Sequence, residues 1–286
     1  MSSTCSDVVL SVSGLRHEYR SDRAVQVALA DVGFEVGRGE VVVVVGPSGC
    51  GKSTLLRIVA GLLRPTAGTI AVDGRPIDGV PDGLGMVFQD YSRSLYPWLR
   101  VRANVEFPVR TRLDRPERRR RAEESLAAVG LSAQADKYPW ELSGGMQQRV
   151  AIARALVGDP ELVLMDEPFA SVDAQTRSEL EDLLLELHGR LGVTVLLVTH
   201  DIDESVYLAD RIVVLSAAPS EVSATVDVDL ARPRDQLATK ADPEFLELRA
   251  RVAGLLKSKR DPAEIQQPAG APLEGVDDSR PAKVPL

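Results

Sequence analysis

The chain has 286 residues, of which 44% are hydrophobic and 27% are charged, and its formal net charge is −8. This composition is typical of a globular protein with a large core, and the acidic balance argues against sequence-independent binding of nucleic acid. No apolar run approaches the roughly 20 residues of a membrane-spanning helix, and residues 1–7 show no basic or hydrophobic leader pattern. We therefore expect neither a membrane span nor secretion.

Strand patterns come first along the chain. Residues 8–12 and 25–36 have strand character and are separated by polar turn residues at 21–23, which predicts an early antiparallel β layer. Five consecutive valines, Val41–Val45, are typical of a strand buried in a parallel sheet. A helix is predicted after Lys52, and short strands are predicted at residues 69–72 and 84–88, separated by a turn-rich segment.

The segment between the valines and that helix matches the phosphate-binding pattern G-x-x-x-x-G-K-[ST]. It consists of Gly46, Pro47, Ser48, Gly49, Cys50, Gly51, Lys52, Ser53 and Thr54. The glycines let backbone N–H groups surround phosphate oxygens, Lys52 can reach the β and γ phosphates, and the Ser53 hydroxyl can bind Mg²⁺. An ordinary glycine-rich turn is the alternative, but the strand before it and the apolar helix after it favour nucleotide binding. We therefore predict that this segment binds a nucleoside triphosphate together with Mg²⁺.

The two cysteines of the chain are Cys5 and Cys50, so we expect no structural disulfide and a reducing compartment. Cys50 has two interpretations, because it lies inside the phosphate loop. It is either a reactive thiol beside a bound phosphate or a small residue tolerated at a variable loop position, and the second is favoured.

The pattern changes after residue 89. Residues 103–158 are mostly helical, and strand character returns at 162–165 and 193–198, with an amphipathic helix at 175–191 between them. This alternation predicts an α/β fold with a parallel sheet and a helical subdomain inserted at about residues 91–158. Further β structure is expected at 213–215 and 223–228 and a helix at 243–256. We therefore expect one domain over residues 1–260 and a flexible, polar tail over 261–286.

A basic segment at residues 110–121 is the local exception to the acidic balance. Pro116 and Gly130 bound a predicted amphipathic helix whose arginines are followed by Glu123 and Glu124. A solvated charged face is the favoured interpretation. Contact with nucleic acid or lipid headgroups is the alternative, but no aromatic residues interleave with the arginines as a base-stacking surface would require.

Two carboxylates, Asp166 and Glu167, follow the predicted strand at residues 162–165. The carboxyl ends of parallel strands meet at one edge of a sheet, so we expect these acids beside the phosphate loop. We predict that Asp166 contacts Mg²⁺ and that Glu167 polarises the attacking water. Alone, the pair would be better explained as an acidic strand end before Pro168, but Lys52 upstream favours the catalytic role.

A second motif, Leu142-Ser143-Gly144-Gly145-Met146-Gln147-Gln148-Arg149, precedes that strand. Together with the phosphate loop it resembles the ATPase subunit of ABC transporters, and the resemblance covers about residues 8–215. It implies a RecA-like P-loop NTPase core. It further implies that Gln89 senses Mg²⁺ and the membrane partner, and that His200 contacts the γ-phosphate. Tyr19 resembles the aromatic residue that stacks on adenine, although an exposed strand-edge tyrosine explains it nearly as well.

The resemblance also implies a dimer. In this family the helix that begins at Ser143, Gly144 and Gly145 serves the nucleotide of the other subunit, although alone it could be a serine-capped helix start. Asp173 matches the aspartate of the dimer-communication loop, although the segment Ala-Ser-Val-Asp departs from the commoner Ser-Ala-Leu-Asp. We therefore expect a head-to-tail homodimer, or a pair with a second ABC ATPase, that encloses two ATP molecules.

The subgroup is indicated by Met146, by residues 199–211 and by residues 232–235, which resemble importers for nitrate, sulfonate and taurine. This resemblance implies an ATPase at the cytoplasmic face of the cell membrane that drives two transmembrane permease subunits. An extracytoplasmic solute-binding protein is then an indirect partner. Permease contact is expected near Gln89 and residues 91–105. The contact candidates there are Tyr96, Pro97 and Trp98, although buried packing explains them about equally well.

A different class stays open, because soluble ABC ATPases that act on DNA ends or ribosomes share both motifs. DNA-repair members insert a long coiled coil and translation factors usually carry two ATPase units, and neither feature is visible in the sequence. A P-loop kinase is a third alternative, but it gives no reason for the second motif or for His200. Import is therefore the favoured function, with no nucleic acid as partner.

Overall fold

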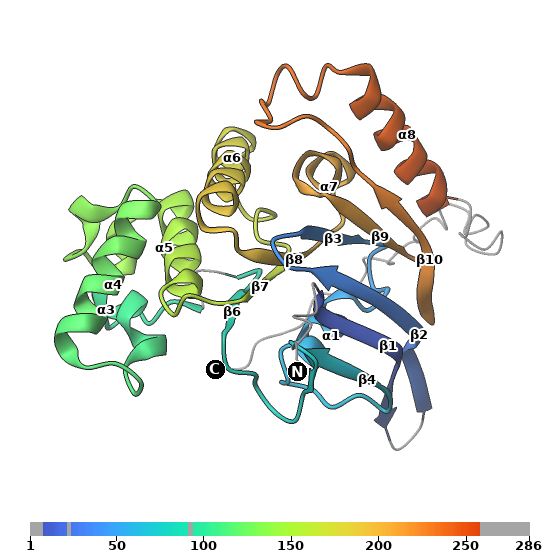
Figure 1. Ribbon diagram of the computed structural model, residues 1–286, viewed down its shortest axis with the longest axis horizontal. Helices are drawn as coiled ribbons and strands as arrows, with labels where there is room; N and C mark the ends of the chain where they lie inside the picture. Colours follow the sequence, from blue (N-terminus) through green and yellow to red (C-terminus); the bar gives the residue numbers. More distant parts are fainter. Residues whose placement is uncertain (1–7, 22–23, 91–93, 258–286) are drawn as a thin grey trace, which may run out of the picture.

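The computed structural model describes residues 8–21, 24–90 and 94–257. Its centre is a ten-stranded mixed sheet with the strand order β5-β4-β1-β2-β10-β9-β3-β8-β7-β6 (Figure 1). The strands are β1 (Val8–Ser21), β2 (Ala24–Gly37), β3 (Val41–Val45), β4 (Ala67–Val72), β5 (Arg75–Pro76), β6 (Leu84–Val87), β7 (Leu162–Asp166), β8 (Thr194–Thr199), β9 (Arg211–Leu215) and β10 (Ser220–Asp227). The helices are α1 (Lys52–Val59), α3 (Val101–Glu106), α4 (Arg115–Ala128), α5 (Gly144–Leu156), α6 (Ala174–Leu191), α7 (Ile202–Leu208) and α8 (Pro243–Lys257), with 3₁₀ turns η1 (Phe107–Val109), η2 (Ser132–Gln134) and η3 (Pro139–Glu141).

The parallel part of the sheet positions the site. Strands β6, β7, β8, β3 and β9 pair in parallel in that order. Every residue of β3, β7 and β8 is buried, which is the reason for the run of valines in β3. The register places Val45 opposite Thr199 and Asp166 opposite Val198. The carboxyl ends of these strands therefore meet at one edge, as the sequence predicts.

The parallel strands separate two hydrophobic cores. Val41, Val43 and Val45 contribute to one core, and Val42 and Val44 contribute to the other. The first core contains apolar side chains of α5, α6, α7 and α8, and the second contains those of α1, β1, β2 and β4. Figure 1 shows α6, α7 and α8 on one side of the sheet and α1 on the opposite side. This layered arrangement gives the α/β fold predicted from the alternation of strands and helices.

The predicted antiparallel layer is present, but its strands are longer than the sequence pattern indicates. β1 pairs antiparallel with β2 and with β4, and it continues to Ser21, well beyond the predicted end at residue 12. Register shifts occur in β1 after Val12 and around His17, and such irregularities break the apolar alternation that marks a strand. One consequence is that Tyr19 lies within β1. At the other end, β10 pairs with β9 and with β2, so it joins the two parts of the sheet.

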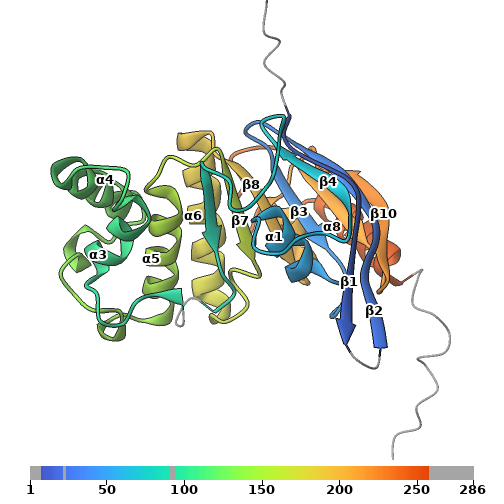
Figure 2. The same cartoon turned by 90° about the horizontal axis from the view of Figure 1, so that it is seen from below.

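Helices α3, α4 and α5 lie together beside the β6 edge of the sheet, and Figure 2 shows α3 and α4 at the opposite end of the molecule from β1 and β2. Helix α4 begins at an Asp114 cap and buries Ala122 and Leu126. Its arginines pair mainly with acids of the same helix. Hydrogen bonds from Arg120 and Arg121 lower the pKa of Glu117 to about 2. These pairs support the interpretation of residues 110–121 as a solvated charged surface.

Helix α8 matches its prediction closely and places Phe245 and Val252 in the first core. Helix α7 was not among the predicted helices, although Asp201 caps it in the manner of a sequence-readable helix start. None of the helices in the described ranges has the length and apolar character that a membrane crossing requires. The predicted tail at 261–286, Cys5 and the turn residues 22–23 lie outside the described residues.

Candidate nucleotide site

The predicted phosphate loop connects the end of β3 to the start of α1. Gly51 immediately precedes α1 with a φ of 97°, a left-handed conformation that favours glycine. At Gly46 a Cβ atom would lie 2.6 Å from Cys50 Sγ, so the turn closes only without a side chain. Ser48 and Gly49 form the exposed tip of the loop. The loop therefore has the compact shape that lets backbone N–H groups converge on an anion.

Lys52 is buried, and its ammonium group lies inside the loop. Its Nζ atom donates to the carbonyl oxygens of Gly46 at 2.8 Å and Pro47 at 3.1 Å. The cationic head is thus held among the backbone groups expected to surround phosphate. Cys50 is also buried, and burial raises the pKa of its thiol, which opposes formation of the reactive thiolate. The structure accordingly favours the role of Cys50 as a small packing residue.

Tyr19 lies beside the loop although it comes from the antiparallel layer. Its hydroxyl group and the Thr54 hydroxyl group are 3.0 Å apart, in hydrogen-bond contact. The residue is 42% exposed, and its ring contacts His17 edge-on with a centroid separation of 4.7 Å. The ring is therefore anchored at both sides next to the start of α1, while much of its surface stays accessible to a base.

Ser53 and Asp166 bring two oxygen ligands together at the edge of the sheet. Ser53 Oγ donates to Asp166 Oδ1 at 2.9 Å. Burial raises the pKa of Asp166, and the Glu167 charge adds to this rise, while the Ser53 hydrogen bond opposes it. A hydroxyl and one carboxylate suit Mg²⁺, which is commonly held by one or two carboxylates together with substrate phosphates. Within the described ranges no cluster of three or more His, Cys, Asp or Glu side chains forms a metal site by itself.

Glu167 is the centre of a cluster built from three strand ends. Its Oε2 atom accepts from Gln89 Nε2 at 3.3 Å and lies 3.1 Å from His200 Nδ1. Its backbone has a φ of 43°, and its N–H donates to Val198 O at 2.9 Å. A non-glycine residue in this left-handed region is strained by about 1–3 kcal/mol, so the surrounding contacts must maintain it. The carboxylate is thus presented at the sheet edge in a defined position.

The remaining predicted residues form a second group at two neighbouring helix starts. Ser143 caps α5 by accepting from Met146 N at 3.4 Å, and Asp173 caps α6 by accepting from Thr176 N at 3.0 Å. A Cβ atom on Gly145 would lie 2.4 Å from Thr176 Cγ2, which shows how closely the two starts pack. Gly144 is the first residue of α5. The side-chain hydrogen bonds of Ser143 and Asp173 are made to residues three positions later in the chain, so both residues act as helix caps.

Comparison with known proteins identifies the family. A family profile described as ABC transporter matches residues 29–170. An uncharacterised ABC transporter ATP-binding protein of Methanocaldococcus jannaschii is 48% identical over 233 residues, which cover 81% of this chain and 85% of that protein. The chain belongs to the ABC transporter ATP-binding family. This ABC ATPase is also 42% identical to the taurine import ATP-binding protein TauB of Yersinia pestis, over 88% of this chain and 99% of that protein.

Two further similarities bear on this ABC ATPase. The nitrate import ATP-binding protein NrtC of Synechococcus elongatus is 44% identical, over 82% of this chain and 36% of that protein. The solved dimeric structure of a post-hydrolysis state of an ATP-binding cassette, bound to ADP and Pi, is 34% identical with a TM-score of 0.67, over 77% of this chain and 98% of that chain. The predicted family, fold class and ATPase activity are therefore confirmed, and the chain is an ATP-binding subunit.

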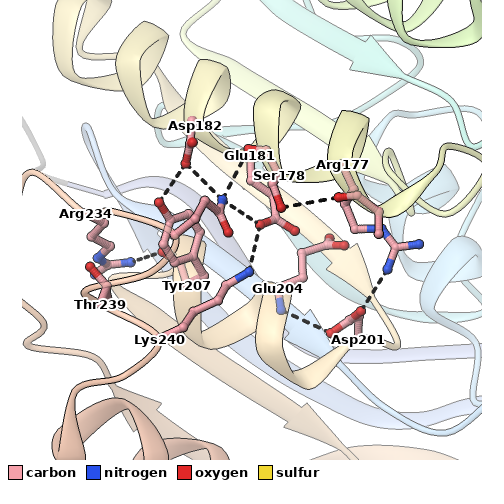
Figure 3. A network of polar contacts seen from close by, with 12 residues as sticks. Arg177, Ser178, Glu181, Asp182, Asp201, Glu204, Tyr207, Arg234, Thr239 and Lys240 are labelled. Carbon is pink, nitrogen blue, oxygen red and sulfur yellow. Dashed lines mark hydrogen bonds and ion pairs between the residues drawn. The ribbon is translucent and has the colours of Figure 1, made fainter.

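After His200 in the chain, this ABC ATPase contains a network of polar contacts that connects α6, α7 and the segment before α8 (Figure 3). Asp201 accepts from Glu204 N at 3.1 Å and pairs with Arg177 of α6 at 3.3 Å. Glu204 is only 4% exposed, and its Oε1 atom has no hydrogen-bond partner among the described residues. Burial, together with the charges of Glu181 and Asp201, raises the pKa of Glu204 to about 8. The carboxyl group of Glu204 is therefore mostly protonated at neutral pH.

The segment that leads to α8 closes this network. Gln236 Nε2 donates to Glu181 Oε2 at 3.0 Å, and Lys240 Nζ pairs with the same oxygen at 3.4 Å. Arg234 donates to the carbonyl oxygens of Tyr207 at 2.6 Å and Ala209 at 2.9 Å. Arg234, expected only as part of a subgroup pattern, therefore ties the C-terminal segment to the end of α7.

Three residues near the site were not predicted from the sequence, namely Gln148, Arg177 and Glu204. Gln148 belongs to the second motif but carried no assigned role. Arg177 and Glu204 look like ordinary charged residues of helices until their burial and contacts are known. Asp201 could have been recognised in the sequence as a helix cap, and it would have predicted helix α7 directly after His200.

Proposed function

We propose that this chain is the ATP-hydrolysing subunit of an importer for nitrate, a sulfonate, taurine or a related small solute. The observation that carries the proposal is the position of Glu167, whose Oε2 atom lies within hydrogen-bond distance of Gln89 and His200. This carboxylate lies at the sheet edge next to the phosphate loop, where a general base must be placed to act on water. The nitrate and taurine importers among its relatives support the class of solute.

The residues of the site divide the work of phosphoryl transfer. The N–H groups of the loop and Lys52 bind the phosphates, and Ser53 and Asp166 hold Mg²⁺. When bound, Mg²⁺ neutralises charge on the β and γ phosphate oxygens. Glu167 accepts a hydrogen bond from the attacking water and orients it. His200, with a 56% exposed side chain, has room to contact a γ-phosphate oxygen as well as Glu167.

Recognition of the base is the proposed role of Tyr19. Its hydrogen bond with Thr54 places the ring directly beside the first turn of α1, and its exposed surface is available for stacking. Aromatic stacking accepts the π-face of any base, so this contact contributes affinity more than discrimination.

The second group of residues indicates a dimer, either of two copies of this chain or with a second ABC ATPase. Ser143, Gly144 and Gly145 start one helix and Asp173 caps its neighbour, so both helix starts present N–H groups on a shared surface. We infer that this surface completes the nucleotide site of the partner, head to tail, with two ATP molecules enclosed. The dimeric state named for a structural neighbour supports this arrangement.

Two permease subunits are the proposed recipients of the motion, and a groove of about 740 Å³ is their docking site. The groove lies between β6, η1 and the end of α5, and Gln89, Tyr96 and Phe107 line it. Because Gln89 also donates to Glu167, a segment seated in the groove would touch a direct partner of the catalytic carboxylate. Trp98 is 70% exposed nearby, which favours a contact role over buried packing.

The proposed organisation follows from these roles. Residues 1–260 act as one ATPase domain, and the helices of residues 91–158 act as an inserted subdomain that carries both the permease groove and Ser143. The chain is peripheral at the cytoplasmic face of the cell membrane, and an extracytoplasmic solute-binding protein delivers the solute to the permease. Nucleic acid is not a partner in this proposal.

The test is purification of the tagged chain from native membranes after mild detergent extraction, with identification of proteins in stoichiometric amounts. Hydrophobic permease subunits would support the importer. Ribosomes or DNA-repair proteins without any membrane protein would contradict it. Uptake of labelled nitrate, taurine and other sulfonates by cells lacking the chain then identifies the solute. Restoration with Glu167→Gln is the matched control, because this variant should assemble the same complex without supporting uptake.

A further inference from the structure

Gln148 is a fully buried amide in α5, and its position is unusual for its residue type. Its exposure is 0%, whereas its neighbours Gln147 and Arg149 are partly exposed. Around it in the helix, Val150, Ala151 and Ile152 belong to the first core. Burying an amide in apolar surroundings is unfavourable unless it forms hydrogen bonds. A specific contact is therefore expected to explain a glutamine at this position.

That contact is made to the residue that follows Glu167. Gln148 Nε2 donates to Pro168 O at 2.7 Å, a side-chain to backbone hydrogen bond between α5 and the turn after β7. Its Oε1 atom has no hydrogen-bond partner among the described residues. The donor function of the amide is thus used, and the acceptor function is not.

The Pro168 carbonyl belongs to the turn that maintains the strained conformation of Glu167. On the strand side, Glu167 N donates to Val198 O at 2.9 Å. On the other side, Ala170 N donates to Glu167 O at 3.2 Å, and Phe169 is fully buried. The hydrogen bond from Gln148 fixes the peptide plane between Pro168 and Phe169. The backbone of Glu167 is therefore held from β8 before the residue and from α5 after it.

We propose that Gln148 is a positioning residue for Glu167, and that it links the catalytic carboxylate of one site to the helix whose start at Ser143 serves the partner's nucleotide. This inference rests on the proposed function of Glu167 and of Ser143. Because α5 is one continuous helix from Gly144 to Leu156, a shift at its start is transmitted to Gln148 and so to the Pro168 turn. Displacement of a reacting group by as little as one ångström is enough to slow an enzyme strongly.

The test uses the full-length chain, purified with the membrane proteins that accompany it, and the variant Gln148→Met. Methionine fills a similar volume but cannot donate to Pro168 O. We expect kcat for ATP hydrolysis to fall by about ten- to a hundredfold, with KM for ATP changed by less than about twofold. The variant should still bind labelled ATP, because Ser143 is unchanged. The matched control is Gln134→Met, the same change at a partly exposed glutamine of η2, which should hydrolyse ATP at the wild-type rate.

Two results would overturn the inference. Wild-type kcat in Gln148→Met would show that the hydrogen bond does not position Glu167. Joint loss of ATP retention and hydrolysis would show that Gln148 acts through the start of α5 instead. The proposed function is tested separately with Glu167→Gln. If this variant hydrolyses ATP at the wild-type rate, Glu167 is not the catalytic carboxylate, whatever Gln148 does.

A second variant keeps the test decisive if Gln148→Met does not fold. In Gln148→Glu a protonated carboxyl group can donate to Pro168 O, whereas the ionised form cannot. Burial should raise the pKa of this carboxyl, so kcat relative to wild type should fall as the pH rises from about 6 to about 9. A constant ratio across that range would contradict a positioning role, because it would mean that the donor makes no difference.

Discussion

Two regions of the molecule, one around Glu167 and the other around Glu204, hold carboxylates that differ in accessibility and in partners. On the nucleotide side, Glu167 is partly exposed and lies against two polar side chains, Gln89 and His200. In the other region, Glu204 is buried next to Glu181, and its Oε1 atom has no hydrogen-bond partner among the described residues (Figure 3). The same type of side chain therefore lies in two different environments. An accessible, oriented carboxylate can act on water, whereas a buried carboxyl group tends to keep its proton.

The largest effect is expected at Glu167. Glu167→Gln removes the proposed base but keeps the size of the side chain, so ATP should bind and turnover should fall by about 10²–10⁴-fold. The dimer should then remain closed on ATP. Phosphate release and gel filtration with ATP measure both effects. Normal hydrolysis in this variant would show that Glu167 is not the catalytic carboxylate. Glu204→Gln is the matched control from the other region, and it should keep wild-type turnover at neutral pH.

Ser143→Arg tests whether the nucleotide region is complete within one chain. A bulky cation at the start of α5 should block the partner's nucleotide contact, so hydrolysis should be abolished while each chain still binds ATP through its own loop. In dimers of one wild-type chain and one Ser143→Arg chain, the inactive site should be the one that contains the phosphate loop of the wild-type chain. Loss confined to the loop of the mutated chain itself would reject the shared-site arrangement.

A pH-dependent effect is expected in the buried region. The pKa of Glu204 in the folded chain is about 8, above the ordinary value of 4.5. The folded state therefore holds a proton that the unfolded state releases, and the stabilising contribution of Glu204 is full below about pH 4.5 and is lost as the pH rises through about 8. The groups that act on Glu204 are Glu181, Asp201, Arg177 and Thr199.

Glu204→Gln removes this titration. Its free energy of unfolding should be close to that of the wild type at about pH 5 and should exceed it by up to a few kcal/mol near pH 9. Thermal or urea unfolding at several pH values measures the difference, and Glu186→Gln, an exposed residue of the same helix as Glu181, serves as control. A stability difference that does not change with pH would mean that Glu204 is not a protonated buried acid.

The smallest effect is expected at the margin of the nucleotide region. Tyr19→Ala removes the ring that is proposed to stack on adenine, so the Kd for ATP should rise by about tenfold, equivalent to about 1.4 kcal/mol. Tyr19→Phe retains the ring and loses only the hydrogen bond to Thr54, so its Kd should change by a few-fold at most. Calorimetric titration with ATP measures the Kd of each variant. Equal weakening in both variants would assign the contribution to the hydroxyl group.

Much of the site could be predicted because its residues occur in local patterns. The phosphate loop favours glycine at Gly51 because of its left-handed backbone, and at Gly46 because a Cβ would lie 2.6 Å from Cys50 Sγ. Asp166 and Glu167 follow an apolar run that is recognisable as a strand. These features depend on neighbours in sequence. The structure brings Gln89, Glu167 and His200 together as the parallel order of their strands implies, while their catalytic roles remain predictions for the measurements above.

Other features could not be predicted because they depend on contacts between distant segments. The extent of β1 to Ser21 depends on pairing with β2 through several register shifts, which erase the alternating pattern. The packing of β10 between β9 and β2 likewise has no local signature.

Sequence alone therefore determined the family, the α/β fold class and where the predicted phosphate loop and carboxylates lie along the chain, because glycine patterns and apolar strand ends are local features. Only the tertiary structure decided which polar residues are buried. Gln148 and Glu204 are unremarkable in the sequence, and their properties arise when α5, α6, α7 and the C-terminal segment exclude water from them. Desolvation and hydrogen bonding are properties of the surroundings, so they can be read only after the surroundings are known.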